Sequence, residues 1–307
     1  MLNYRNKSIF GLDFYIDNDI SSIISMKIAN ALVNYKNKYK LICLKNVLVR
    51  NDDKQILIKL EILCNDSNDI VDYIKQSNII SELHNLCALD NYILQSFNVE
   101  ITKKNFNKYN PVLTLYGSEY IMFKFNIRNF EYKFYINSYN YFQTNNYVLP
   151  QLYEYIYNTC KGVDTKNIIC IGDDSGNISI ILSNLYKKIN VYTPCHISYY
   201  ASVQNKLLNN ISNITLYNKG KKYNELINLH SEEFLLLINP GRKGITNENI
   251  NYINENIYIK YVIYMSCKPE TLTKNLNDLK LKVKSKKTFN MFDNVENYCE
   301  NVVLLEK

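Results

Sequence analysis

Short apolar segments alternate with helical patterns throughout the second half of the chain. Residues 198–210 and 269–281 have the spacing of amphipathic helices. Strands that alternate with helices of about 10–15 residues are typical of βαβ units, so we predict a doubly wound α/β domain with a mostly parallel sheet. A ligand of such a sheet binds at the carboxyl ends of its strands. The strands are expected at residues 167–171, 190–193, 214–217, 234–239, 261–265 and 301–305.

The first half of the chain is less regular and predicts a smaller α+β domain. Pro150 fits the first turn of a helix over residues 150–161, and six of the eight glycines follow residue 161. We therefore expect an N-terminal α+β domain at residues 1–145 and the α/β domain at residues 146–307. Two hairpins and a helix are expected in the first domain, at residues 39–49 with 55–64, 120–125 with 131–136, and 66–77.

Composition and charge narrow the class of protein. The apolar fraction of 47% is enough to bury real cores, so wholesale disorder is not expected. A net charge of +7 favours an anionic partner, of which nucleic acid is the commonest. Charge alone leaves a basic surface without a special role equally open.

The spacing of the cysteines and the hydropathy of the chain indicate whether to expect a metal site, a membrane segment or a particular cellular compartment. The eight cysteines form no C-x-x-C pair, so neither a metal site nor an iron–sulfur cluster is expected. Scattered cysteines fit a reducing compartment. We find no secretory signal and no run of 18 apolar residues, so no membrane partner is expected. We expect a cytoplasmic location, and leave nucleus and organelle open.

Cys267 is the candidate nucleophile. It follows an apolar strand, precedes a helix that begins at Pro269, and has Lys268 beside it. A cation and a helix N-terminus lower the pKa of a thiol and so raise the thiolate fraction. A lone cysteine is more often a small buried hydrophobe, and we keep that interpretation for the other seven.

Glu300 is the candidate base. It begins the apolar C-terminal strand, where partial burial would raise the pKa of its carboxyl into a useful range. Considered alone, this segment fits a solvated carboxylate at a strand end equally well.

Three further segments have the composition of ligand sites. Gly172 and Gly176 lie in a strand–helix turn where glycine lets backbone amides approach an adenosyl or phosphate group, although the spacing does not fit G-x-G-x-x-G. Asn239 ends a strand before Pro240, with charged residues behind it. Gln143 lies among aromatic residues where the two halves meet. Each segment also fits an ordinary turn or packing contact.

Taken in order, five segments resemble the RNA uracil-C5 methyltransferase family, the tRNA and ribosomal RNA 5-methyluridine enzymes. The longest is YMSCKPETLTKNL at residues 264–276, which is similar to Y-x-S-C-N-P-x-T-L-x-x-x-L. The others are residues 4–7 (Y-R-N-K), 141–145 (F-F-Q-x-N), 239–244 (D-P-P-R-x-G) and 300–305 (the end of H-x-E-x-V-x-L-L).

The resemblance implies the class I S-adenosylmethionine (SAM)-dependent methyltransferase fold, SAM as cofactor and RNA as substrate. It implies that residues 1–145 form an RNA-binding domain and residues 146–307 the SAM-binding catalytic domain. The thiolate of Cys267 would add to uracil C6, and Glu300 would remove the C5 proton after methyl transfer. The chain begins at the Y-R-N-K segment, so we expect the shorter tRNA-type group, acting in tRNA processing. The matching cofactor contacts are Gln143, Gly172, Asn177, Thr193 and Asn239.

The chain departs from the family in the cofactor site. Cys170, Thr193 and Asn239 stand where the family has acidic residues, and loss of the second of these carboxylates would weaken SAM binding by roughly tenfold to a hundredfold. Tyr298 replaces a histidine before the base. A degenerate member that binds or helps to fold tRNA without methylating it is therefore the main alternative.

A third hypothesis, an amino-group methyltransferase, comes from the likeness of Asn239-Pro240 to an N-P-P-Y loop. That chemistry needs an aromatic side chain after the prolines, and Gly241 and Arg242 supply none. It also leaves Cys267 and Glu300 without roles, so it ranks last.

Overall fold

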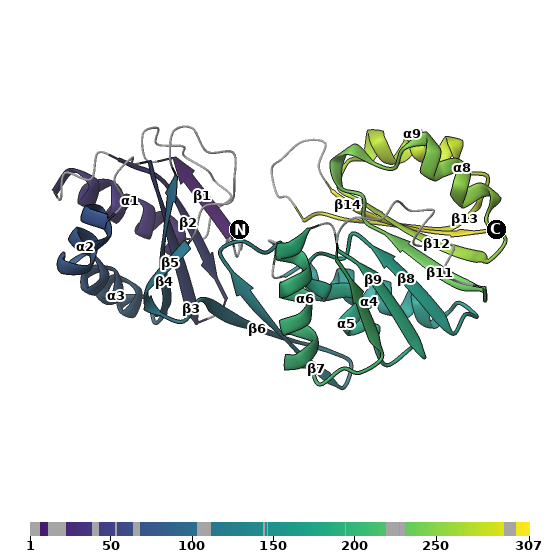
Figure 1. Ribbon diagram of the computed structural model, residues 1–307, viewed down its shortest axis with the longest axis horizontal. Helices are drawn as coiled ribbons and strands as arrows, with labels where there is room; N and C mark the ends of the chain where they lie inside the picture. Colours follow the sequence, from purple (N-terminus) through teal and green to yellow (C-terminus); the bar gives the residue numbers. More distant parts are fainter. Residues whose placement is uncertain are drawn as a thin grey trace. The chain divides into compact units, whose positions relative to one another are not determined.

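The computed structural model divides into two compact units (Figure 1). The first unit comprises Met1–Phe123, Tyr135–Tyr139 and Thr144–Asn146, and the second comprises Lys124–Phe134, Asn140–Gln143 and Tyr147–Lys307. The structure describes residues 7–11, 23–38, 43–52, 54–63, 68–102, 112–143, 145, 147–193, 195–218, 227, 231–291 and 299–307.

The first unit is a five-stranded sheet with helices on one face (Figure 1). Its core is formed by buried aliphatic side chains of both layers, among them Ile28, Leu32, Ile58 and Leu83. The predicted hairpin is present, because β2 and β3 pair antiparallel. The elements are β1 (Lys7–Gly11), α1 (Ile23–Lys38), β2 (Leu44–Asn51), β3 (Gln55–Leu63), α2 (Asn68–Gln76), α3 (Ile79–Leu89), β4 (Ile93–Thr102) and β5 (Val112–Gly117).

A second hairpin, β6 (Tyr120–Ile127) and β7 (Phe130–Asn137), contributes to both units. Its tip belongs to the second unit, since the ring of Phe125 stacks on Phe134 and lies 5.4 Å from Tyr153. The division therefore interleaves between residues 124 and 147, where the sequence suggested a single boundary after residue 145. Alternation along the hairpin predicts its strands but not the aromatic contact that fixes its tip.

The second unit is a seven-stranded sheet in the order β10-β9-β8-β11-β12-β14-β13. The first five strands are parallel, and β14 pairs antiparallel with both β12 and β13. The predicted α/β fold with a doubly wound, mostly parallel sheet is confirmed. The strands are β8 (Asn167–Ile171), β9 (Lys188–Tyr192), β10 (Ile214–Tyr217), β11 (Phe234–Ile238), β12 (Ile259–Ser266), β13 (Lys282–Phe289) and β14 (Glu300–Glu306). The helices are α4 (Leu149–Lys161), α5 (Asn177–Ile181), α6 (His196–Leu208), α8 (Asn247–Glu255) and α9 (Pro269–Asp278).

Helices cover both faces of this sheet, α8 and α9 on one and α4, α5 and α6 on the other (Figure 1). Ile169 and Ile171 share a core cluster with Leu272 of α9. Cys170, between them, points to the opposite face, toward Cys160 of α4. Burial on both faces explains why the central strands are continuous apolar runs rather than alternating ones.

Two observations concern what the described residues do not contain. No helix among them is long and apolar enough to cross a membrane. No group of three or more His, Cys, Asp or Glu side chains in the same ranges is placed to hold a metal ion. Tyr4, Arg5 and Asn6 of the Y-R-N-K segment and Tyr298 lie outside the described residues.

Candidate active site

Strand pairing brings Cys267 and Glu300 together. Ser266, the last residue of β12, pairs with Asn301 of β14 in an antiparallel ladder. Cys267 directly follows Ser266 and Glu300 directly precedes Asn301, so both residues lie at the end of this ladder. The negative charge of Glu300 raises the pKa of the Cys267 thiol, which agrees with this proximity. The two residues that the sequence selected as nucleophile and base therefore share one strand end.

Glu300 is a buried carboxyl. Only 2% of the residue is exposed, and burial raises the pKa of its carboxyl to about 8. Its Oε1 atom accepts no hydrogen bond from any residue that the structure describes. A buried carboxyl with a pKa of about 8 is mostly protonated at neutral pH and can exchange its proton near pH 8.

The environment of Cys267 differs from the one that the sequence suggested. Burial raises the pKa of the half-buried thiol, and Glu300 raises it further. Arg242 acts in the opposite direction, through its charge and a hydrogen bond to the sulfur. Lys268 forms an ion pair with Glu270 at 3.7 Å. The predicted lowering of the thiol pKa by Lys268 is therefore wrong, because burial dominates and the nearby cation is Arg242.

The turn that presents Arg242 is fixed by the neighbouring helix. The side chain of Asn275 in α9 accepts a hydrogen bond from Ile245 N at 3.1 Å and donates one to Ile245 O at 3.1 Å. The Tyr264 hydroxyl donates to the same Asn275 oxygen at 2.7 Å. Gly244 has a φ of +70°, and a Cβ there would lie 2.3 Å from that oxygen. These contacts set the path of the backbone that carries Arg242.

A narrow pocket lies at the carboxyl ends of β8 and β11, in the same unit. Of the predicted cofactor residues, Gln143, Asn177 and Asn239 line it. Met265, two residues before Cys267, also lines it. The Asn177 Oδ1 atom is buried and has no hydrogen-bond partner among the described residues, so it remains available to a ligand. The remaining lining residues are Tyr141, Tyr153, Asp173 and Ile178.

Asp173 is a lining residue that the sequence did not single out. Its carboxylate accepts hydrogen bonds from Ile178 N at 3.0 Å and Ser179 N at 2.8 Å, which caps the start of α5. Burial raises the pKa of this carboxyl, while those hydrogen bonds oppose the rise. An acidic residue just after an apolar strand was the available signal.

Tyr153 connects the pocket to Glu300. Its ring is buried in α4, and burial raises the pKa of its hydroxyl, followed by the charges of Asp173, Tyr141 and Glu300. The hydroxyl therefore lies near carboxyl groups from both places. The narrow pocket and the Cys267–Glu300 pair thus lie at the same end of the sheet.

Gly172 and Thr193 lie at neighbouring strand ends but do not line the pocket. The Thr193 hydroxyl donates to Tyr217 O at 3.2 Å. Gly172 has a φ of +83° and packs against the backbone of Asn239. Asn239 N in turn donates to Ile171 O at 2.9 Å. Gly172 thus holds the ends of β8 and β11 together.

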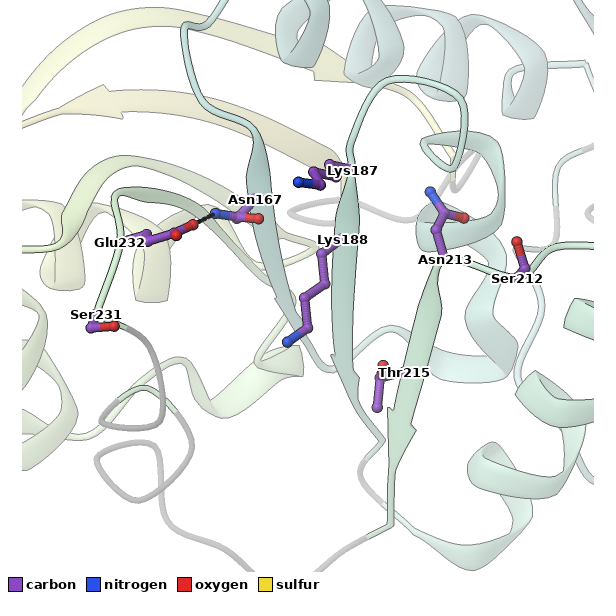
Figure 2. A pocket seen from close by; sticks show the side chains of 8 residues that line it. All are labelled: Asn167, Lys187, Lys188, Ser212, Asn213, Thr215, Ser231 and Glu232. Carbon is purple, nitrogen blue, oxygen red and sulfur yellow. Dashed lines mark hydrogen bonds between the residues drawn. The ribbon is translucent and has the colours of Figure 1, made fainter.

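A second, open cavity of 530 Å³ lies at the other end of the sheet. Figure 2 shows Asn167, Lys187, Lys188 and Thr215 along its wall, with Asn167 donating to Glu232. Asn167 and Lys188 begin β8 and β9, Lys187 directly precedes β9, and Thr215 is the second residue of β10. The cavity is therefore remote from Cys267, which follows the carboxyl end of β12.

Comparison with known families agrees with this arrangement. The sequence model of the tRNA (uracil-5-)-methyltransferase family matches residues 21–307. The chain belongs to this family. The predicted resemblance is confirmed over most of the chain.

Curated relatives of the family are moderately similar. An uncharacterized RNA methyltransferase of Clostridium acetobutylicum is 25% identical over 276 residues, which are 86% of this chain and 56% of that protein. A tRNA/tmRNA (uracil-C(5))-methyltransferase of Aliarcobacter butzleri is 28% identical over 231 residues, 70% of this chain and 59% of that protein. The chain spans about half the length of the curated relatives that it matches.

A solved member of the family shares the fold. The crystal structure of Pyrococcus abyssi tRNA (uracil-54, C5)-methyltransferase in complex with S-adenosyl-L-homocysteine superposes with a TM-score of 0.74. The match covers 99% of this chain and 76% of that one, at 15% sequence identity. The predicted class I methyltransferase fold is confirmed by this likeness.

Gly172 provides a test of how the strand ends are held. Gly172→Ala should lower the free energy of unfolding by about 2–4 kcal/mol, since its Cβ would lie 2.2 Å from Asn239 O at a φ of +83°. Gly241→Ala is the matched control, because Gly241 has a φ of +71° but nothing within 4 Å. Its free energy of unfolding should fall by only about 1 kcal/mol, the cost of holding alanine in the left-handed backbone conformation. Urea denaturation measures the free energy of unfolding of both variants. Equal decreases in Gly172→Ala and Gly241→Ala would contradict the close packing of Gly172 against Asn239.

Proposed function

We propose that this protein is a SAM-dependent methyltransferase acting on C5 of uracil in RNA, with tRNA as its substrate. The observation that supports this most directly is that Cys267 and Glu300 adjoin the last pair of the β12–β14 ladder, close enough for Glu300 to affect the pKa of the thiol, near the pocket that Met265 lines. Family membership supports the same chemistry.

The proposed chemistry needs a nucleophile and a base on one side of a pyrimidine. The Cys267 thiolate forms a bond to C6, which makes C5 electron-rich. SAM supplies the methyl group, and C5 then carries both that methyl and its original hydrogen. Glu300 accepts the C5 proton, the C5–C6 double bond re-forms and the sulfur leaves. The target uridine must first turn out of its stack to reach the thiol.

Arg242 and Glu300 have opposite effects on the pKa of the Cys267 thiol. At pH 7 a carboxyl with a pKa of about 8 is mostly protonated, so its charge opposes the thiolate only weakly. The Arg242 guanidinium favours the thiolate through its charge and its hydrogen bond. Addition to C6 is therefore easiest while Glu300 is neutral. Glu300 must then release its own proton to solvent before it accepts the C5 proton.

The residues of the narrow pocket fit one end of SAM. The Asn177 Oδ1 atom lacks a partner among the described residues and can accept a hydrogen bond from SAM. The oxygens of Asp173 and Gln143 already accept hydrogen bonds, from Ile178 N and Ser179 N and from the Tyr141 hydroxyl. Its free volume of 10 Å³ is about that of one water molecule, so the rest of SAM would lie beyond it.

A degenerate member that binds tRNA without methylating it is the second candidate. It is favoured by the neutral residues at the strand ends where the family has acids. Thr193 directs its hydroxyl to Tyr217 O, and Cys170 is buried against α4, so neither replaces a carboxylate facing a ligand.

Two measurements separate these functions. Isothermal calorimetry with SAM should give a binding signal, and incubation with SAM and a tRNA transcript should produce 5-methyluridine, detected by mass spectrometry after digestion. Product with a ribosomal RNA fragment but not with tRNA would correct the substrate alone. Neither SAM binding nor 5-methyluridine with either RNA would overturn the enzymatic proposal in favour of the degenerate one.

A further inference from the structure

Strand β13 is unusually basic for a strand of the sheet. Four of its eight residues are lysines: Lys282, Lys284, Lys286 and Lys287. All four are exposed, and so is Val283, with 50% of its surface accessible. β13 is the last strand in the sheet order, so within the described residues its outer edge has no strand partner. This basic edge, defined as residues 282–287, is not used by the proposed chemistry.

The basic edge starts beside the candidate base and leads away from it. Phe289 pairs with Glu300, and Lys287 pairs with Val302. At about 3.3 Å per residue, Lys286 lies roughly 10 Å along the strand from Phe289 and Lys282 roughly 23 Å. If one unit of a polymer reacts at Cys267 and Glu300, the neighbouring units of that polymer can lie along this row of lysine ammonium groups.

Little of this positive charge is neutralised locally. Lys284 forms an ion pair with Glu306 at 2.8 Å. Lys287 lies over the rings of Tyr155 and Phe289, which ties it to the packing of α4. For Lys286 the structure shows no ion pair among the described residues. The edge therefore keeps a net positive charge facing solvent.

We propose that the basic edge binds the phosphate backbone of the RNA that flanks the target uridine. This inference rests on the proposed function and adds the path of the substrate to it. Lysine ammonium groups bind phosphate as point charges and position a strand without reading its sequence. A second copy of the chain paired edge to edge would bring two rows of lysines together, so like charge disfavours that occupant.

The alternative role of such lysines is to protect an open sheet edge from aggregation. The two roles differ in what removal of charge does. Protection predicts self-association with unchanged affinity for RNA. Backbone binding predicts weaker RNA binding and a smaller dependence on salt, because each lost phosphate contact lowers the slope of log K against log salt by about 0.7–0.9.

The test compares two double variants of the full chain. Lys282→Gln with Lys286→Gln removes two charges from the basic edge and leaves the ring contacts of Lys287 intact. Lys187→Gln with Lys188→Gln is the matched control, because these lysines are also exposed but lie at the amino end of β9 (Figure 2). Binding of a tRNA transcript is measured by fluorescence anisotropy across a series of salt concentrations, and SAM binding by calorimetry.

We expect the edge variant to bind tRNA about tenfold more weakly near 0.1 M salt, with a slope reduced by about 1.4–1.8. The control should match the unmodified protein, and SAM binding should be unchanged in both. An edge variant with unmodified affinity and slope would overturn the inference while leaving the proposed function intact. Equal weakening in both variants would also overturn it, since general charge would then be the cause. If the unmodified protein fails to bind tRNA, the proposed function itself fails.

Discussion

Cys267→Ala should abolish a covalent complex with RNA that contains 5-fluorouridine. In the unmodified protein the thiolate bonds to C6 and the methyl group arrives at C5, but fluorine cannot be removed as a proton. The sulfur then cannot leave, and the adduct persists. A denaturing gel should show a band with the combined mass of protein and RNA only when SAM is present. With ordinary RNA, formation of 5-methyluridine should fall by roughly 10⁴-fold or more in the variant.

Cys299→Ala is the control for this experiment. Cys299 is also a free, half-buried thiol, and it directly precedes Glu300. Its sulfur lies 3.2 Å from the Asn301 amide, and no proposed step uses it. Loss of the adduct only in Cys267→Ala supports the nucleophile. An adduct that persists in Cys267→Ala and disappears in Cys299→Ala would transfer the role to Cys299.

The sequence predicts the central fold well because the physical signal is local. Strands β8 and β11 are buried on both faces, so each appears as an unbroken apolar run. Between them, α6 forms where residues 198–210 have helical spacing, whereas the short α5 is buried at every position. Cys267 could be selected for the same reason, since it directly follows a buried strand and precedes Pro269.

Other features depend on pairing between distant residues. The sequence does not indicate β13 as a strand, because this edge strand is exposed on both faces and its lysines give no apolar pattern. Its formation depends on backbone pairing with β14. The direction of the Cys267 pKa shift likewise depends on burial and on Arg242 and Glu300, which are not its neighbours in the chain. Lys268, the adjacent cation, was a misleading local signal because it pairs with Glu270.

Glu300→Gln should separate the steps of the reaction. The amide keeps the size of the side chain but cannot accept the C5 proton. Addition of Cys267 and methyl transfer do not require that proton to leave, whereas release of the sulfur does. Ordinary tRNA incubated with SAM should therefore accumulate on the variant as a covalent, methylated adduct while free product falls by at least about 10²–10⁴-fold. If Glu300→Gln accumulates no adduct and forms free product as fast as the unmodified protein, Glu300 has no role in the mechanism.

The same substitution should stabilise the folded protein at alkaline pH. The carboxyl pKa rises from its ordinary value near 4.5 to about 8 on folding, so the unfolded chain ionises first. Glu300 therefore destabilises the folded state increasingly between pH 4.5 and 8, and the effect levels off above pH 8. Glu300→Gln removes this term. Its advantage over the unmodified protein should be small near pH 5 and reach roughly 3–5 kcal/mol at pH 8.5, measured by denaturant unfolding.

Glu306→Gln is the control of opposite sign on the same strand. The hydrogen bond and ion pair with Lys284 lower the pKa of the partly exposed Glu306 carboxyl, so its contribution to stability is present above the ordinary pKa and is lost as pH falls. This variant should be no more stable than the unmodified protein at pH 8.5. Equal stability of Glu300→Gln and the unmodified protein at both pH values would mean that Glu300 is already ionised in the folded state. It would then oppose the Cys267 thiolate throughout the cycle, and addition to C6 would depend on Arg242 alone.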